Sequence, residues 1–461
     1  MSFTDDALAD DDATGLAQRL RCREVSPVEV RDAVAERLAR VDPTIRGLGL
    51  DRVADPVPGD PDGPFAGVPT LVKESTAVAG WPTTHGSAAV VPVPAPEHGA
   101  VTRQLLGLGL DLVGTSRMPE FGLNATTEFV DAEPTRNPYD PEFSAGASSG
   151  GAAALVAAGV VPLAHANDGG GSIRIPSAAC GLVGLKPGRG VTAPSASGAV
   201  MPIDLVAEGV VTRSVRDTAR AFAGMSGQAL VEGPGSRRLR IGLVLHSPAG
   251  GEVDGETRAA VLATAHALEA QGHVVVPHVP AVGPAFVDDF LVYWGLLAFS
   301  ITVGGRFAFG RSFDPSRLDP LTHGLARHFR TTAPRRPGFL RRLRAVGATY
   351  ADEFVHHDVL LSPVLAHRTP RLGHLHPAVP FDELRERLVR YVGFTPLQNV
   401  AGAPAIAVPA GVDAHGLPVG VHLAAARGDE RTLLELAYAL EELRGGGPGS
   451  RRAPRSAAPA R

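Results

Sequence analysis

The order of apolar and polar residues predicts a chain in which helices and strands alternate. Amphipathic spacing predicts helices at 14–23 and 26–41, and the second begins with a capping box, S-P-V-E at 26–29. Short apolar runs bounded by turn residues predict buried strands. We expect strands at 67–74, 110–114, 239–245, 273–277, 358–364, 405–409 and 419–423, and further helices at 101–109, 152–160, 256–271, 384–391 and 429–443. This alternation is typical of an α/β fold.

Three segments depart from this alternation. Segment 286–303 is the most apolar and aromatic part of the chain, but Asp288, Asp289 and Gly295 interrupt it. We therefore expect it to line a pocket or pack in the core instead of crossing a membrane. The arginine-rich segment 304–344 has few periodic signals and predicts a surface excursion, and the pattern-free end predicts a disordered tail at 444–461 after a single domain at 1–443.

Composition narrows the class of protein. The chain has 461 residues, 44% of them hydrophobic and 20% charged, which is typical of a globular protein in solution. A net charge of -4 gives no reason to expect nucleic acid or an acidic membrane as partner. Two distant cysteines and a start without a basic, apolar leader predict a cytoplasmic protein. The sequence has no HExxH or GxxxxGK[ST] motif, so we expect no metal and no other cofactor.

Lysine is almost absent from this chain. Of the 44 lysine and arginine residues, only Lys73 and Lys186 are lysine. Arginine stays protonated in proteins, whereas a buried lysine can become a neutral base, so a retained lysine is a candidate for chemistry. The alternative is that coding bias favours arginine throughout the chain and that the two lysines remain by chance. Lys73 ends an apolar strand, where burial would favour its neutral form.

Two clusters of serine and glycine flank a short apolar helix. The first is S-A-G-A-S-S-G-G at 144–151, and the second is N-D-G-G-G-S-I-R-I-P at 167–176. The glycines of the second cluster predict a loop of exposed N–H groups that ends at a hydroxyl, as an oxyanion hole beside a nucleophile requires. A flexible linker is the alternative, but I-R-I-P and small packed residues follow directly. The sequence shows no evident histidine partner for a serine nucleophile, so a lysine base would complete the site.

These motifs together resemble the amidase signature family. G-V-P-T-L-V-K-E at 67–74, the two clusters above, and G-L-V-G-L-K-P at 181–187 occur in the family's order, and the similarity covers roughly 15–443. The resemblance implies an α/β fold with a large twisted mixed β-sheet covered by helices on both faces. It also implies hydrolysis of amide, and sometimes ester, bonds by a Ser-cisSer-Lys triad.

The resemblance assigns roles to individual residues. Ser172 would be the nucleophile that forms the acyl-enzyme, Ser149 the bridging serine and Lys73 the base. The peptide bond between Ser148 and Ser149 would be cis. The oxyanion hole would consist of the backbone N–H groups of Gly169, Gly170, Gly171 and Ser172. Lys186 would have a structural role near Pro187.

The chain departs from the family pattern at three positions. Asn167 replaces a threonine beside the oxyanion loop, and Ala147 replaces a glycine in the first cluster. Neither change removes a catalytic group. Arg117 stands where relatives often have asparagine, and it would either bind an acidic substrate or point to solvent. The residue sequence of the second cluster resembles that of the family branch with the nylon-oligomer (cyclic aminohexanoate dimer) hydrolases more than that of the glutamyl-tRNA amidotransferase A subunits.

The resulting functional hypothesis is an amidase that acts alone on a small-molecule amide. An amidotransferase A subunit that works on tRNA with partners, and a catalytically silent relative, remain as alternatives. The sequence leaves a homodimer open. We expect Met118 and Trp294 to contact substrate, the latter because aromatic residues are scarce in this chain but gather in one segment. That gathering consists of Phe290, Tyr293, Trp294 and Phe299, which would alternatively pack in the core.

Overall fold

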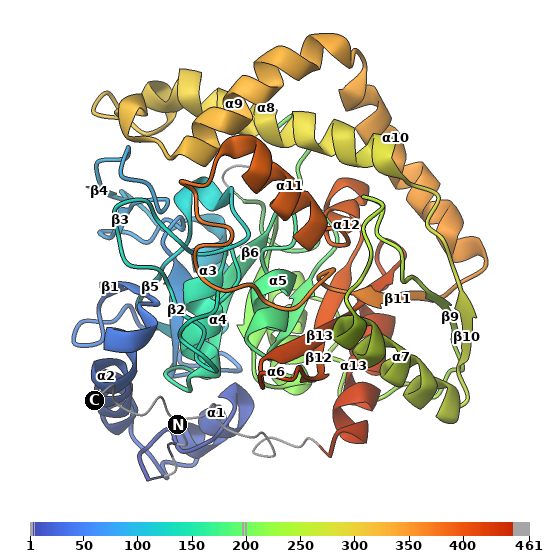
Figure 1. Cartoon of the computed structure of the whole chain (residues 1–461). Helices are drawn as coiled ribbons and strands as arrows, with labels where there is room; N and C mark the ends of the chain where they lie inside the picture. The colour runs from blue at the N-terminus through green and yellow to red at the C-terminus, as the bar shows by residue number, and fades with distance from the viewer. Residues whose placement is uncertain (1–2, 4, 196–197, 199–200, 446–461) are drawn as a thin grey trace.

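A mixed sheet of eight strands runs through the middle of the molecule (Figure 1). The computed structural model describes residues 3, 5–195, 198 and 201–445. The strands are β6 (Leu163–Asp168), β7 (Val183–Lys186), β8 (Ala207–Thr212), β9 (Arg240–Leu243), β10 (Val274–Pro277), β11 (Val359–Pro363), β12 (Ala405–Val412) and β13 (Pro418–Ala425). Their order is β10-β9-β11-β13-β12-β7-β8-β6. The pairs of β9 with β10 and β11 are parallel and the others antiparallel, which confirms the predicted mixed sheet.

A second sheet of three strands lies beside β6. It consists of β1 (Leu48–Asp51), β5 (Leu110–Ser116) and β2 (Val68–Lys73), in the order β1-β5-β2. The Thr70 hydroxyl of β2 donates to the Leu163 carbonyl at the start of β6, at 3.1 Å. Further along, the Lys73 N–H of β2 donates to His165 of β6, so the two strands run side by side in the same direction. Their carboxyl ends, with Lys73 and Asp168, therefore lie at the same edge. A short pair, β3 (Pro82–Thr83) and β4 (Val93–Pro94), is separate.

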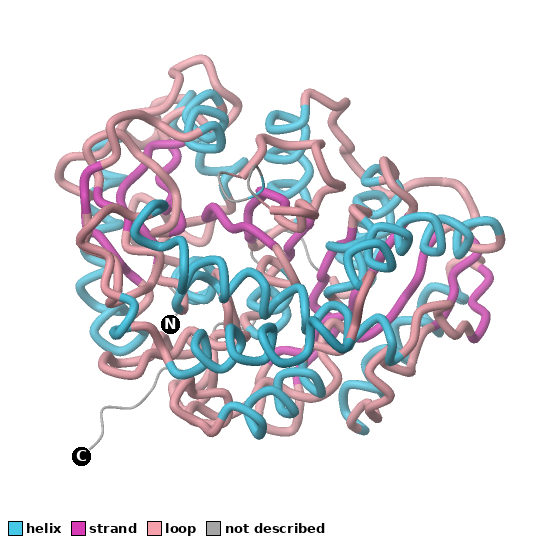
Figure 2. Tube along the Cα trace, turned by 90° about the horizontal axis from the view of Figure 1, so that it is seen from above, coloured by secondary structure: helices cyan, strands magenta, loops and turns pink. Residues whose placement is uncertain are grey.

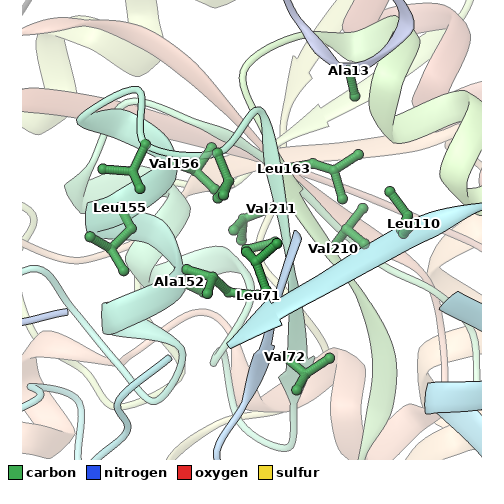
Figure 3. Close-up of a cluster of buried hydrophobic side chains, with 14 of the residues drawn as sticks. Ala13, Leu71, Val72, Leu110, Ala152, Leu155, Val156, Leu163, Val210 and Val211 are labelled. Atoms are coloured by element: carbon green, nitrogen blue, oxygen red, sulfur yellow. The ribbon is translucent and has the colours of Figure 1, made fainter. Parts of the chain in front are cut away.

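Helix α4 (Gly150–Ala157) fills the space beside these strands. Ala152, Ala153 and Ala154 are fully buried, and Figure 3 shows Ala152 next to Leu71 of β2. Small side chains allow the helix to approach closely, and a Cβ on Gly151 would lie 2.5 Å from the Arg117 backbone nitrogen. The segment predicted as a buried helix is thus the element that joins the two sheets.

Helices cover both faces of the large sheet. Side chains alternate between the two faces along a strand, so neighbouring residues of β12 pack against helices on opposite faces of the sheet. Ile406 packs with α6 (Val215–Ser226), α7 (Gly255–Ala270) and α13 (Glu430–Leu443). Ala407 packs on the opposite side with α5 (Arg174–Ala179) and α11 (Phe381–Tyr391). The strand, helix, strand unit predicted around α7 is also confirmed, because β9 and β10 flank this helix and pair in parallel.

Segment 304–344, where few periodic signals predicted a surface excursion, is largely helical. This segment contains the end of α8 (Pro284–Ala308), all of α9 (Pro320–Thr332) and the start of α10 (Phe339–Asp352). Prolines and arginines obscured the periodicity, but Leu321 and Leu325 form a buried face of α9. The three helices form a layer above the sheet (Figures 1 and 2).

Helix α8 is long and apolar enough to span a membrane by length and composition. Part of its apolar surface packs inside the protein. Val292 and Tyr293 are fully buried, and a Cβ on Gly295 would lie 2.7 Å from the Leu325 carbonyl oxygen of α9. The glycine therefore permits the two helices to pack closely.

The remaining helices lie nearer the chain ends or connect strands. They are α1 (Ala13–Arg21), α2 (Pro27–Ile45), α3 (Ala100–Gly107) and α12 (Pro396–Ala401). The capping box of α2 is confirmed, because Glu29 N donates to Ser26 Oγ at 3.2 Å and Ser26 N donates to Glu29 Oε2 at 2.8 Å. Most of the predicted tail, at 446–461, lies outside the described residues, and the single domain at 1–443 stays a prediction.

Candidate active site

Lys73 ends β2 and is completely buried. Its Nζ donates to Ser148 Oγ at 2.7 Å and to Asn167 Oδ1 at 2.7 Å. Ser148 lies just before α4, and Asn167 belongs to β6. The amine thus joins three segments that are distant in the sequence, and its two contacts hold it in one position.

Burial lowers the pKa of the Lys73 ammonium to about 8, because the charged form loses its hydration. The carboxylates of Glu208, Asp168 and Glu74 act in the opposite direction, since each favours the charged form. The result is an amine that can lose its proton near neutral pH. This matches the expectation for a lysine at the end of an apolar strand.

The serine that contacts Lys73 is Ser148, which corrects the prediction of Ser149. Ser149 is the N-cap residue of α4, and its Oγ donates to the Asn167 carbonyl oxygen at a long 3.4 Å. The cis peptide bond likewise lies between Ala147 and Ser148, not between Ser148 and Ser149. Adjacent side chains leave the backbone in different directions, so one serine of the pair faces the lysine and the other does not. A serine doublet in the sequence does not reveal which one it is.

Met118 borders the contact between Lys73 and Ser148. Gly122 has a φ of +70°, and a Cβ at this glycine would lie 3.0 Å from Ser148 Oγ and 3.5 Å from Met118 Cε. The Met118 backbone nitrogen donates to Glu74 Oε1 at 2.8 Å, which fixes the segment. Met118 is therefore placed where it could meet a substrate, and that contact stays a prediction.

The glycine loop after β6 is held from two sides. The Asp168 carboxylate accepts from the backbone nitrogens of Gly171 at 2.6 Å and Ile173 at 3.1 Å. The Thr395 hydroxyl donates to the Gly170 carbonyl at 2.7 Å. Gly171 has a φ of +135°, and a Cβ there would lie 2.4 Å from Thr395 Oγ1. A side chain at this position would therefore collide with the residue that fixes the loop.

Three N–H groups of this loop are free to bind a ligand. Those of Gly169, Gly170 and Ser172 donate to no acceptor among the residues that the structure describes. The N–H of Gly171 is bonded to Asp168, which removes one member of the predicted set of four donors. Ser172 is half-buried at the end of the loop. Free donors beside an accessible hydroxyl suit the stabilisation of an oxyanion.

A buried ion pair fixes the base of the loop. Arg174 Nε lies 2.9 Å from Asp168 Oδ2, and neither side chain is accessible to solvent. Asn399 donates to Asp168 Oδ1 at 2.9 Å and accepts from Arg174 at 2.6 Å. Burial alone would raise the pKa of Asp168, but the Arg174 guanidinium outweighs it and holds this pKa well below its usual range. Asn399 begins N-V-A-G-A-P at 399–404, and these residues alone do not indicate this contact.

Two buried histidines near the site are bonded within the protein. His165 Nε2 lies 2.9 Å from Glu208 Oε2, and His422 Nε2 lies 3.0 Å from Arg174 Nη1. Sequence patterns singled out neither residue, because each lies within an apolar strand. No three His, Cys, Asp or Glu side chains of the described chain are grouped as metal ligands.

Arg117 and Lys186 make structural contacts. Arg117 donates to the Glu133 carbonyl at 2.9 Å, and its guanidinium lies 4.1 Å from the centre of the Phe129 ring. Lys186 is buried and donates to the Pro187 carbonyl at 2.7 Å, which agrees with the role expected for it. These contacts explain both side chains without a substrate.

The aromatic residues of α8 divide between core and site. Tyr293 is fully buried, and its hydroxyl bonds to both backbone polar groups of Ile203, so the core interpretation holds for it. Phe290 reaches the glycine loop, since its Cζ lies 3.6 Å from the Cβ position of Gly170. Trp294 and Phe299, the other two aromatic residues singled out in this segment, are half-buried against an apolar cluster. The cluster includes Ile175 of α5, close to the loop.

Comparison with known proteins identifies similar chains. The family model described as Amidase matches residues 50–434. A putative amidase AmiC of Mycobacterium leprae (strain TN) is 44% identical and covers 96% of this chain and 97% of its own length. A 6-aminohexanoate-cyclic-dimer hydrolase of Pseudomonas sp. (strain NK87) is 33% identical, with 93% and 94% covered. A solved structure of 6-aminohexanoate cyclic dimer hydrolase superimposes with a TM-score of 0.83 at 28% identity, over 94% of this chain and 97% of that one.

The adjacent serines provide a matched pair of variants. We expect Ser148→Ala to lower kcat for a simple amide about 100-fold or more, because it removes the hydroxyl that contacts Lys73. Ser149→Ala should leave kcat within about threefold, since the hydrogen bond it loses is long and weak. Steady-state kinetics on both variants, with melting curves to confirm folding, test this. A larger loss in Ser149→Ala would restore the original interpretation.

Proposed function

The chain belongs to the amidase signature family and is a hydrolase of amide C–N bonds, and on this premise we propose that it acts through an acyl-enzyme on Ser172. Ser148 and Lys73 would relay the proton. The observation that carries the proposal is the 2.7 Å contact between Lys73 Nζ and Ser148 Oγ in a fully buried setting. Asn167 supports it, because its Oδ1 accepts from the amine, and when Lys73 is neutral the nitrogen lone pair can accept from Ser148.

The first half of the reaction forms the acyl-enzyme. Neutral Lys73 accepts the proton of Ser148 Oγ, which in turn accepts the proton of Ser172 Oγ. Ser172 Oγ attacks the carbonyl carbon, and the new C–O bond places negative charge on the carbonyl oxygen. The free N–H groups of the glycine loop stabilise this oxyanion. When the C–N bond breaks, the proton returns through Ser148 to the leaving nitrogen, and an amine departs.

The second half releases the acid. Water gives a proton to the same relay and attacks the ester carbonyl of acylated Ser172. The C–O bond to Ser172 then breaks, the proton returns to Ser172 Oγ, and the carboxylic acid leaves. One amide and one water thus yield one acid and one amine, and every group of the enzyme returns to its initial state.

We propose a small-molecule amide with an apolar acyl portion as substrate. Phe290 and Trp294 support this, because their side chains adjoin the loop and the apolar cluster beside it. An acyl chain packed on them would bind through burial, at about 25 cal/mol per Å². Relatives named as 6-aminohexanoate-cyclic-dimer hydrolases make amides with several methylenes a rational first choice for assays.

Labelling of Ser172 tests the proposed nucleophile directly. We expect wild-type protein to gain the mass of one fluorophosphonate adduct, and Ser172→Ala to gain none, because a methyl group cannot attack phosphorus. Intact-mass spectrometry measures the adduct on each protein, and a parallel assay measures turnover of simple amides by the purified chain. Equal labelling of the two proteins would reject Ser172. Labelling without amide turnover would favour the amidotransferase subunit instead.

The pH dependence tests the proposed base. Since Lys73 must be neutral to accept a proton, kcat/KM should rise with pH with a midpoint near 8, well below the roughly 10.4 of free lysine. Lys73→Arg should be as inactive as Lys73→Ala, because a guanidinium stays protonated. Activity of the arginine variant above a tenth of wild type would show that Lys73 only positions Ser148.

The substrate preference tests the role of α8. We expect Trp294→Ala and Phe290→Ala to reduce the preference for a hexanoyl amide over propionamide by about tenfold each, since each removes about 1.4 kcal/mol of apolar contact. Phe307→Ala is a matched control on the same helix, because this phenylalanine is 98% exposed. An equal loss on both substrates in folded variants would contradict the proposed pocket.

A further inference from the structure

A buried histidine and a buried glutamate lie beneath Lys73 and take no part in the relay described above. His165 belongs to β6 and is fully buried, and Glu208 belongs to β8 and is 3% exposed. Asn167 pairs with Glu208 in the antiparallel register of these strands, so their side chains share one face of the sheet. His165, two residues before Asn167, shares that face as well. The face is the one on which β2 and Lys73 pack.

The hydrogen bonds define how His165 is protonated. The Lys73 backbone nitrogen donates to His165 Nδ1 at 3.2 Å, and an N–H group can only donate. Nδ1 is therefore the unprotonated ring nitrogen, and the proton of the neutral ring is on Nε2. Nε2 lies 2.9 Å from Glu208 Oε2, so it donates to this carboxylate. The imidazole connects the main chain of Lys73 to the carboxylate of Glu208.

Glu208 differs from the other carboxylates that face Lys73. Asp168, on β6, is neutralised by its ion pair with Arg174. Glu74, next to Lys73 in the chain, accepts from Thr84 and from the Met118 backbone and has Arg117 in its field. Glu208 has the neutral ring of His165 as its one side-chain partner in the described chain. Among the described residues Glu208 forms no ion pair with an arginine, and its charge acts on Lys73.

We infer that His165 and Glu208 are positioning residues for Lys73. His165 fixes the main chain from which the lysine extends, and Glu208 supplies the charge that makes the buried amine a sufficiently strong base. This inference rests on the proposed role of Lys73 as proton acceptor. When Lys73 takes a proton in the transition state, positive charge develops on a buried nitrogen, and the Glu208 carboxylate stabilises it. A purely structural pair would fill the same space without affecting the base.

Glu208→Gln tests this inference, because glutamine has the same shape and can still accept from His165 Nε2. Without the negative charge Lys73 becomes a weaker base. We expect the midpoint of the kcat/KM profile to fall by about one pH unit. The plateau value of kcat should fall about threefold, as expected when the base weakens by one unit. A structural role would not move the midpoint.

Glu128→Gln is the matched control. Glu128 is also 3% exposed and accepts two hydrogen bonds, from Thr126 and the Gly373 backbone, but it does not contact Lys73 or its partners. This variant should keep the wild-type midpoint. The inference is overturned if Glu208→Gln keeps the wild-type midpoint, or if both variants shift equally.

Two histidine variants test the contact to the main chain. The Oδ1 atom of asparagine can take the place of Nδ1 as acceptor, so His165→Asn should keep kcat within about threefold of wild type. Leucine has no acceptor, so His165→Leu should lower kcat about tenfold with little change in KM. Equal kcat losses in both would overturn this part. Lys73→Ala and Ser172→Ala, assayed alongside, separate a failure of the proposed function from a failure of this inference. If these two variants remain active, the proposed function fails. If they are inactive, only the positioning role of His165 and Glu208 is in question.

Discussion

The site depends on one amine, that of Lys73, which is completely buried. A lysine side chain that loses its hydration is stable only if its hydrogens find acceptors, and Lys73 finds them in Ser148 and Asn167. Those acceptors come from the segment before α4 and from β6, so the contact can form only when the two sheets and the helix are packed together. The fold and the site therefore form together.

The glycine loop obeys a different constraint. Its backbone must leave N–H groups unbonded, which costs stability unless something else holds the loop in place. Asp168 and Thr395 provide this hold on either side, and the Arg174 ion pair fixes Asp168 itself. The donors are thus oriented before a ligand arrives. Close contacts at Gly171 show how little space the arrangement leaves.

The sequence predicted the fold class, most of the strands and the segments that carry the site. It did so because apolar periodicity and glycine-rich loops are local signals, visible within ten residues. It did not distinguish Ser148 from Ser149, because the direction of a side chain depends on backbone geometry that a doublet does not encode.

Residues distant in the chain were missed for another reason. Nothing in A-E-G-V-V-T at 207–212 shows that the charge of Glu208 acts on a lysine more than a hundred positions earlier. Asn399 of α12 likewise contacts Asp168 only in the folded chain. The helices at 304–344 were missed because their periodicity is interrupted by prolines and arginines. A charged or amide residue inside an apolar strand is nevertheless a signal, because burial of such a group requires a partner.

The scarcity of lysine has a consequence for the chemistry of the surface. Lys73 and Lys186 are the only lysines of the chain, and the exposed fractions of their side chains are 0% and 1%. The folded protein thus presents no lysine amine to solvent. An ester on an enzyme can be attacked by amines as well as by water, and amines on neighbouring molecules of the same enzyme would compete as acyl acceptors. Guanidinium groups, which stay protonated, are not nucleophiles under these conditions. Under the proposed acyl-enzyme mechanism, copies of this protein at high concentration are therefore protected from acylating one another through their lysine side chains.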